Sequence, residues 1–247
     1  MSLDVVDLRS FYVHPLGKVA RRFVGVGIRR IWTGSRGLRI LGIGYSTPYL
    51  GLFREEAERC LAFMPATQGV MKWPSQRPTL AALVDEAELP LPEAAVDRIL
   101  LVHALEMTHD APALLREVWR VLAPGGRLLA VVPNRRGVWA RMDTTPFGHG
   151  RPYSRSQITQ LLRETWFTPT SWGEALYVPP ISRGLFLRAA VAWERAGATI
   201  SAPFAGVHIV EATKQVYRAV PARREKRQLV PGLAPVLEPV LTPSTGA

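Results

Sequence analysis

The stretch ILGIGYSTPYL, residues 40–50, joins an apolar run, two glycines one residue apart and a Thr-Pro step where Thr47 can cap a helix. This order predicts a strand, a tight corner and a helix N-terminus. Gly42 and Gly44 lie where the strand ends, and a residue without Cβ lets a ligand approach the backbone. A helix N-terminus attracts anionic groups. Taken alone, however, such a corner also fits a purely structural role.

Short apolar runs recur along the chain beyond this corner. They lack strict alternation, as expected for strands covered on both faces. Helix signals lie between them: Asp110 can cap a helix over 111–122, and Ser154 with Gln157 fits a capping box that opens a helix over 155–166. This alternation predicts an α/β fold with a Rossmann-like, doubly wound, mostly parallel sheet. The predicted strands are 38–43, 60–64, 79–84, 96–102, 126–132 and 206–216.

Composition divides the chain into three parts. Residues 1–37 predict an N-terminal helical segment, because apolar residues recur at helical spacing over 15–32. Residues 38–217 hold the predicted sheet. Residues 218–247 are rich in proline, glycine and charge, and they predict a basic, mobile tail.

Basic charge is concentrated in the N-terminal part. The 247 residues carry a net charge of +11, and the stretch from Arg9 to Arg39 holds eight Lys or Arg and no Asp or Glu. A second basic cluster lies at 223–227. Such asymmetry indicates an anionic partner (nucleic acid, a lipid surface or an acidic substrate), unless the arginines only form solvated faces. Motifs with interleaved aromatics are missing, which argues against specific nucleic-acid recognition.

The basic helix predicted over 15–32 is expected to pack on the domain. Contact with a membrane surface is the weaker alternative, because Gly25 and Gly27 lower the stability of such a helix in isolation. Oligomeric state is not indicated by any pattern in the chain.

Other classes of function find little support in the residues. Cys60 is the only cysteine and the histidines are scattered, so neither a disulfide framework nor a metal site is expected. No apolar run approaches the ~20 residues that span a bilayer, and no signal region follows the N-terminus, so we expect a cytoplasmic protein. A dinucleotide fingerprint fails, because Pro48 stands at the third glycine and the second strand ends in Met64-Pro65 without an acid. A phosphate-binding P-loop fails as well, since no Gly-Lys-Ser/Thr follows.

Four ordered segments resemble the class I S-adenosylmethionine-dependent methyltransferases, in particular the small free-standing bacterial ones. The segment ILGIGYSTP resembles their first strand and glycine loop, and LVDEAELPLPEAAVDRILLVHALE (83–106) their acidic turn and fourth strand. Likewise LLREVWRVLAPGGRLLAVVPN (114–134) and RPYSRSQITQLLRETWFTP (151–169) resemble the segments that follow. The resemblance covers roughly residues 38–170, and the whole chain is similar to methyltransferase-like proteins of alphaproteobacterial type. It implies S-adenosylmethionine as the cofactor.

The resemblance also implies a set of cofactor residues. Gly44 matches the first glycine of the family loop, Asp85 matches the acid that binds the adenine amino group, and Met64 replaces the ribose-binding carboxylate. That loss removes a charge-assisted hydrogen-bond pair of about 1.5–3 kcal/mol, unless Glu55 or Glu106 substitutes. The full implied set is Gly42, Gly44, Tyr45, Ser46, Thr47, Met64, Asp85, Glu86, His103 and Ala104.

The loop after the fifth strand, residues 134–154, is where an acceptor is expected to bind. It concentrates arginines that could hold an anionic substrate and aromatics that could cover it. The substrate-binding candidates are Tyr12, Arg135, Arg136, Trp139, Arg141 and Phe147. His149 or Tyr153 could accept a proton if the reaction requires a base. The alternative is a surface loop whose aromatics close the edge of the sheet.

These patterns together predict a methyltransferase that acts on a small or lipid-like, anionic acceptor. By the same resemblance, Tyr12, His14 and the basic helix are expected to form a lid over the cofactor. A non-catalytic cofactor sensor or interaction protein is the alternative, with a basic nucleic-acid-binding protein as a third class.

Overall fold

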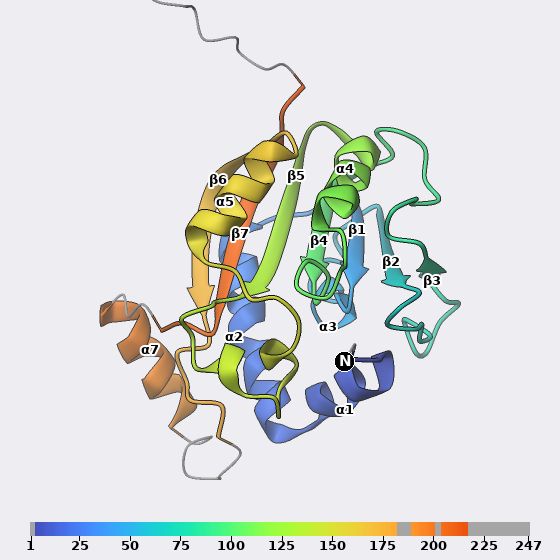
Figure 1. The fold of residues 1–247 in the computed structure, drawn as a ribbon. Coiled ribbons are helices and arrows are strands. Elements are labelled where there is room, and N and C mark those ends of the chain that lie inside the picture. The colour runs from blue at the N-terminus through green and yellow to red at the C-terminus, as the bar shows by residue number, and fades with distance from the viewer. Residues whose placement is uncertain (1–2, 182–188, 201–203, 217–247) are drawn as a thin grey trace, which may run out of the picture. The chain divides into compact units, whose positions relative to one another are not determined.

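The computed structural model describes residues 3–181, 189–200 and 204–216 and contains a seven-stranded sheet in the order β3-β2-β1-β4-β5-β7-β6. Strands β1 to β5 run parallel, whereas β7 is antiparallel to both β5 and β6 (Figure 1). The strands are β1 (Arg39–Gly44), β2 (Arg59–Pro65), β3 (Ala81–Val84), β4 (Val96–Val102), β5 (Leu122–Pro133), β6 (Phe167–Ala175) and β7 (Val207–Lys214).

Helices cover both faces of this sheet. The N-terminal helices α1 (Val5–Val13) and α2 (Pro15–Ile31) share one buried cluster with β1 residues such as Ile40. Helices α4 (Ala111–Val121) and α5 (Arg155–Glu164) share the other cluster with the next β1 residue, Leu41. Successive strand residues therefore face opposite cores, which explains the unbroken apolar runs in the sequence. The remaining elements are α3 (Thr47–Leu50), η1 (Trp139–Arg141), η2 (Pro146–Gly148) and α7 (Ala190–Ile200).

Local sequence signals set several element ends. Strand β4 has the predicted bounds, Val96–Val102. Asp110 Oδ1 accepts a hydrogen bond from Ala113 N at 2.8 Å, and Ser154 forms the predicted capping box with Gln157. These two predictions of helix starts are confirmed. The prediction at Thr47 was wrong in detail: Ser46 is the residue before α3, and its side chain makes no capping hydrogen bond.

The connections around β3 depart from a regular alternation of strands and helices. Helix α3 has only four residues, and the described segments 66–80 and 85–95 contain no helix. Strand β5 begins at Leu122, because Leu122 pairs with Val96 before the Pro-Gly-Gly turn that was predicted to precede the strand. Helix α4 consequently passes directly into β5. The prediction of a separate tail from residue 218 lies outside the described residues.

The strand order reverses beside β1. From β1 the chain proceeds outward to β2 and β3, then returns to place β4 on the other side of β1. The carboxyl ends of β1 and β4 therefore meet at the switch point of the sheet, which is the place of the ligand crevice in parallel α/β sheets. Helix α1 lies beyond these strand ends (Figure 1). The fold thus brings the glycine corner, the end of β4 and the N-terminal helix to one place.

Strand β7 completes the sheet by inserting between β5 and β6. Glu211 of β7 accepts hydrogen bonds from Trp32 Nε1 at 3.0 Å and from Thr170 Oγ1 at 3.0 Å. His208 Nδ1 lies 3.3 Å from the Glu174 carboxylate on β6. These polar side chains of β7 pair with neighbouring elements of the fold.

Candidate active site

The corner after β1 is closely packed against the end of β4. Gly44 has a φ of +77°, which favours glycine, and a Cβ there would lie 2.9 Å from both Ala104 Cβ and the His103 carbonyl oxygen. A Cβ at Gly42 would collide with the Ser46 side chain. Both glycines are therefore required by packing, and this structural reason accounts for the Gly-x-Gly step without a ligand.

Tyr12 of α1 lies at the centre of this corner and is 6% exposed. Its hydroxyl is 2.9 Å from His103 Nε2 and 3.1 Å from the Tyr49 hydroxyl. Its ring stacks on Tyr45 with 5.6 Å between ring centroids. Burial raises the pKa of Tyr12 well above its ordinary value and raises the pKa of Tyr45 to about 12, so both phenols are neutral at physiological pH.

His103 follows β4 and is fully buried, with a φ of +50°. Its Nδ1 lies 3.1 Å from Glu106 Oε1. Because a carboxylate only accepts, Nδ1 carries the proton, and in the neutral ring Nε2 accepts from Tyr12. The Gln68 side-chain amide donates to the His103 carbonyl oxygen. A chain of polar contacts thus connects α1, the end of β2 and the end of β4.

Two buried side-chain oxygens near this chain have no hydrogen-bond partner among the described residues. They are Ser46 Oγ in the β1 corner and Glu106 Oε2 after β4. Buried polar atoms are normally satisfied, so two orphaned atoms in one corner require an explanation.

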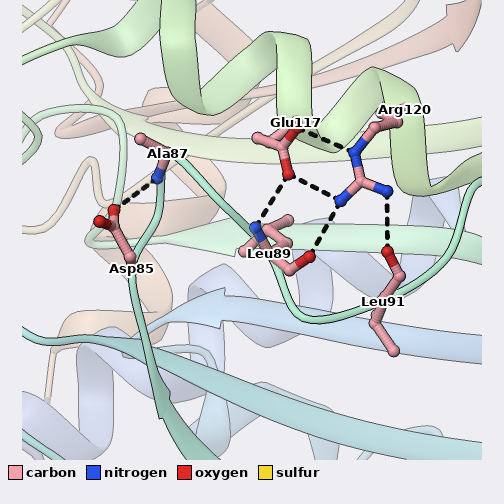
Figure 2. Close-up of polar contacts among 6 residues, drawn as sticks. All are labelled: Asp85, Ala87, Leu89, Leu91, Glu117 and Arg120. Carbon is pink, nitrogen blue, oxygen red and sulfur yellow. Dashed lines mark hydrogen bonds and ion pairs between the residues drawn. The ribbon is translucent and has the colours of Figure 1, made fainter.

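The turn after β3 carries the two predicted adenine-side acids. Asp85 is exposed, and its Oδ1 accepts from Ala87 N at 2.9 Å (Figure 2). Glu86 accepts from the Thr108 hydroxyl. Glu117 and Arg120 of α4 hold the segment that follows: the Glu117 carboxylate accepts from Leu89 N, and Arg120 donates to the Leu89 and Leu91 carbonyl oxygens. Helix α4 thereby fixes the turn that presents Asp85.

The contacts of Glu117 with Arg120 and Leu89 predict that the stability of the protein falls at acidic pH. Hydrogen bonds from Arg120 hold the pKa of Glu117 below its ordinary value, so its stabilising contribution is present above the unfolded-state pKa of about 4.3 and is lost as the pH falls through the lower folded-state pKa. In urea unfolding at neutral pH, Glu117→Gln is expected to lose about 1–2 kcal/mol relative to wild type. The difference should shrink below about pH 4. The exposed Glu164→Gln is the control. If the free energy of unfolding of wild type and Glu117→Gln depended on pH in the same way, the prediction would be contradicted.

The loop after β5 separates the predicted acceptor residues into two groups. Trp139 and Phe147 are each 1% exposed. Trp139 donates to the Val178 carbonyl oxygen at 2.7 Å, and the Phe147 ring lies 4.9 Å from that of His103. These aromatics close the edge of the site from within. The loop arginines Arg135, Arg136, Arg141 and Arg151, in contrast, are exposed.

Two cavities lie beside the strand ends. One of about 540 Å³ separates α1 from residues 143–149, and its lining includes Phe11, His14 and His149. His149 Nε2 lies 2.7 Å from the Asp143 carbonyl oxygen, which leaves Nδ1 with a free lone pair.

The other cavity, of about 400 Å³, is lined by Arg135, Arg151, Tyr153 and His109, among others. Tyr153 donates to the Leu105 carbonyl oxygen at 3.1 Å, and burial raises its pKa. Arg136 and Arg141 line neither cavity.

Comparison with known proteins finds methyltransferases that resemble part of this chain. Residues 24–130 match the family model described as a methyltransferase domain. Over 83 residues the chain is 39% identical to a probable S-adenosylmethionine-dependent methyltransferase of Mycolicibacterium smegmatis. The middle part of this chain is therefore similar to methyltransferases. The aligned stretch is 33% of this chain and 32% of the relative, so the match spans about a third of either protein.

Solved structures share the fold of the methyltransferase domain. An S-adenosylmethionine-dependent methyltransferase from Thermotoga maritima aligns with a TM-score of 0.55 and 15% identity, over 85% of this chain and 95% of that one. A 4+2 cyclase aligns with a TM-score of 0.56 and 21% identity, over 80% and 82% of the two chains. Such likeness shows the fold alone, and the reaction has to be argued from the site. Both methyltransferases named here depend on S-adenosylmethionine.

The residues of the methyltransferase domain match this cofactor in chemistry but leave no space for it in the present conformation. Ser46 Oγ and Glu106 Oε2 are unpaired and buried at the crevice, and Gly44 and Ala104 keep it narrow at its base. The side chains of Tyr45, Ser46, Met64 and His103, however, are each at most 4% exposed, and the rings of Tyr45 and His103 pack against Tyr12 of α1. Neither predicted substitute takes the place of Met64 in this arrangement: Glu55 is 73% exposed beside Arg54, and Glu106 pairs with His103.

Sequence reasoning missed two residues of the crevice. Tyr49 contacts the Tyr12 hydroxyl, and Gln68 bonds the His103 backbone. Tyr49 follows the Thr-Pro step within the stretch 40–50. Its place in a helix that begins beside the two glycines could have indicated that it lies at the site. Gln68 belongs to no motif, and only the folded chain places it beside His103.

Proposed function

We propose that this chain transfers a methyl group from S-adenosylmethionine to a small, anionic acceptor. One observation carries the proposal: at the switch point beside β1, the predicted cofactor residues of the β1 corner and of the β4 end lie together under a single short helix. The bound cofactor supplies an activated methyl group on sulfur. The chain has to bind it, orient the acceptor opposite that methyl group and exclude water.

In this proposal, α1 is a lid that opens to admit the cofactor. When Tyr12 withdraws, the walls formed by Tyr45, Ser46 and His103 become accessible, and the Ser46 hydroxyl and Glu106 carboxylate gain the partners that they lack. Gln68 holds the His103 backbone in place during this change. Closure of α1 then shields the reacting atoms from water.

The acceptor's anionic group is assigned to the cavity with two arginines. Arg135 and Arg151 line this cavity together, and an exposed guanidinium can donate two parallel hydrogen bonds to a carboxylate or phosphate. Tyr153 supports the wall through its bond to Leu105 and, with a raised pKa, stays protonated and does not act as the base. Where an acceptor must lose a proton, His149 is the candidate base because its Nδ1 lone pair is free.

The test is a screen for S-adenosylhomocysteine release with carboxylate-bearing and phosphate-bearing acceptors. With an acceptor that turns over, the double variant Arg135→Ala/Arg151→Ala is expected to raise KM about tenfold or more with little change in kcat, since charge-assisted bonds are lost in both ground and transition states. Arg136→Ala/Arg141→Ala, which removes the same charge outside both cavities, is the matched control.

Two outcomes would contradict the proposal. An equal rise in KM in both double variants would mean that only the general charge of the loop matters. A wild-type chain that releases no S-adenosylhomocysteine in the screen and does not bind it in calorimetry up to about 1 mM would exclude the reaction itself.

A further inference from the structure

The exposed side of α2 carries a groove that shares Tyr49 with the cofactor crevice and no residue with the two acceptor cavities. It runs between α2 and α3 and encloses about 450 Å³. Its rim is basic and its floor is apolar. The lining residues are Lys18, Arg21, Arg22, Gly25, Val26, Arg29, Pro48, Tyr49 and Leu52.

The floor of the groove is aliphatic and open to solvent. Val26 is 45% exposed and Leu52 is 40% exposed. Gly25 lies beneath them, and a Cβ at Gly25 would sit 3.6 Å from Leu52 Cδ1. Glycine at this position therefore leaves the floor deeper than an alanine would.

The rim carries more positive charge than the nearby carboxylates neutralise. Arg29 forms an ion pair with Glu56, and Arg21 donates to the Pro48 carbonyl oxygen at 3.0 Å. Lys18 and Arg22 form no ion pair with any residue in the described part of the chain. Three of the four cations at this rim thus lack a carboxylate partner, while aliphatic side chains lie between them.

We propose that this groove docks the protein on the surface of an anionic phospholipid bilayer. Charge complementarity selects an anionic partner, since each Lys or Arg near an anionic bilayer favours binding by about 1 kcal/mol, which is about fivefold. The aliphatic floor selects lipid over nucleic acid: Val26 and Leu52 can enter the headgroup and acyl boundary, whereas nucleic-acid grooves use exposed aromatic faces for stacking. The only aromatic ring in the lining, that of Tyr49, is fully buried.

The docking is peripheral. Among the described helices none is long and apolar enough to cross a membrane. The buried side of α2, which includes Ala20, Val24 and Ile28, stays packed against the sheet, so only the opposite face is available for lipid. The proposal is independent of methyl transfer and holds for a chain with or without bound cofactor.

Sedimentation of the full chain with vesicles tests the proposal. Wild type is expected to sediment with vesicles that contain phosphatidylglycerol and to stay in solution with pure phosphatidylcholine vesicles. The variant Lys18→Ala/Arg22→Ala is expected to bind about 25-fold more weakly, at fivefold per cation. Arg116→Ala/Arg163→Ala removes two exposed cations from α4 and α5, on the opposite face of the sheet, and should bind like wild type.

A thiol label reports whether the groove itself meets the lipid. The native Cys60 is buried, and burial raises its pKa to about 11, so a polarity-sensitive thiol reagent will modify Leu52→Cys selectively. The label at residue 52 is expected to shift to the blue on anionic vesicles and to remain unchanged on neutral ones.

The proposal is overturned by any of three results. These are failure of wild type to bind anionic vesicles, equal weakening in the two double variants, and vesicle binding without a spectral shift at residue 52. Binding that persists unchanged in Lys18→Ala/Arg22→Ala would assign it to another basic segment, such as 223–227. A duplex DNA oligonucleotide that binds more tightly than the vesicles, and less tightly in that same variant, would replace lipid by nucleic acid.

Discussion

Tyr12→Phe is expected to bind S-adenosylmethionine about fivefold or more tightly than wild type. The closed position of α1 is held in part by the Tyr12 hydroxyl, which contacts His103 Nε2 and the Tyr49 hydroxyl. Each such bond contributes about 0.5–1.5 kcal/mol, and phenylalanine forms neither. Because the cofactor binds only the open form in our proposal, its apparent Kd falls as the open fraction rises.

Calorimetric titration of the two proteins measures this effect. Tyr49→Phe is the graded control, since it removes one of the two hydroxyl contacts and should produce a smaller gain in affinity. An unchanged or weaker affinity in a folded Tyr12→Phe protein would show that α1 does not compete with the cofactor. The tyrosine would then belong to the bound state, as a wall of the site.

Gly44→Ala is expected to lower the free energy of unfolding by about 2–4 kcal/mol. The φ of +77° is strained for alanine. The new methyl group would also meet the Val102 carbonyl oxygen and lie 2.9 Å from Ala104 Cβ. These neighbours are backbone or Cβ atoms of β4 and its end, so no side-chain rotation can relieve the contact and β1 and β4 must separate.

Urea unfolding of the variant beside Gly51→Ala checks this prediction. Gly51 lies seven residues further on, with a φ of −57° and nothing within 4 Å of an added Cβ. Alanine there should leave stability unchanged or raise it by about 0.5 kcal/mol. A Gly44→Ala protein as stable as wild type would mean that the corner is looser than its packing indicates.

The sheet was largely predictable because its strands are buried on both faces. The run over residues 99–102 within β4 is apolar throughout, which favours a buried strand, and polar caps such as Asp110 and Ser154 mark helix starts through bonds to residues three positions away. The connections around β3 were less predictable. Segments 66–80 and 85–95 are stabilised by distant partners instead, as when Arg120 holds Leu89 and Leu91.

The candidate site was predictable only in outline. The glycine corner and the end of β4 carry local signals, and their meeting follows from the strand order. The contact of Tyr12 with His103 joins residues 91 positions apart on separate elements, and no local pattern encodes it. The aromatic side chains of Trp139 and Phe147 were compatible with a cover over the substrate or with closure of the edge of the sheet. Their nearly complete burial shows that they pack within the protein.

The position of β7 has a consequence for how the chain is made. This strand is the last described element, yet it lies between β5 and β6, and its Glu211 bonds Trp32 across 179 residues. While the ribosome is still producing residues before 207, β5 and β6 are both complete and both present an unpaired edge. The sheet therefore closes only after Val207–Lys214 has been synthesised, and a chain interrupted before Val207 exposes two strand edges that favour pairing with other chains.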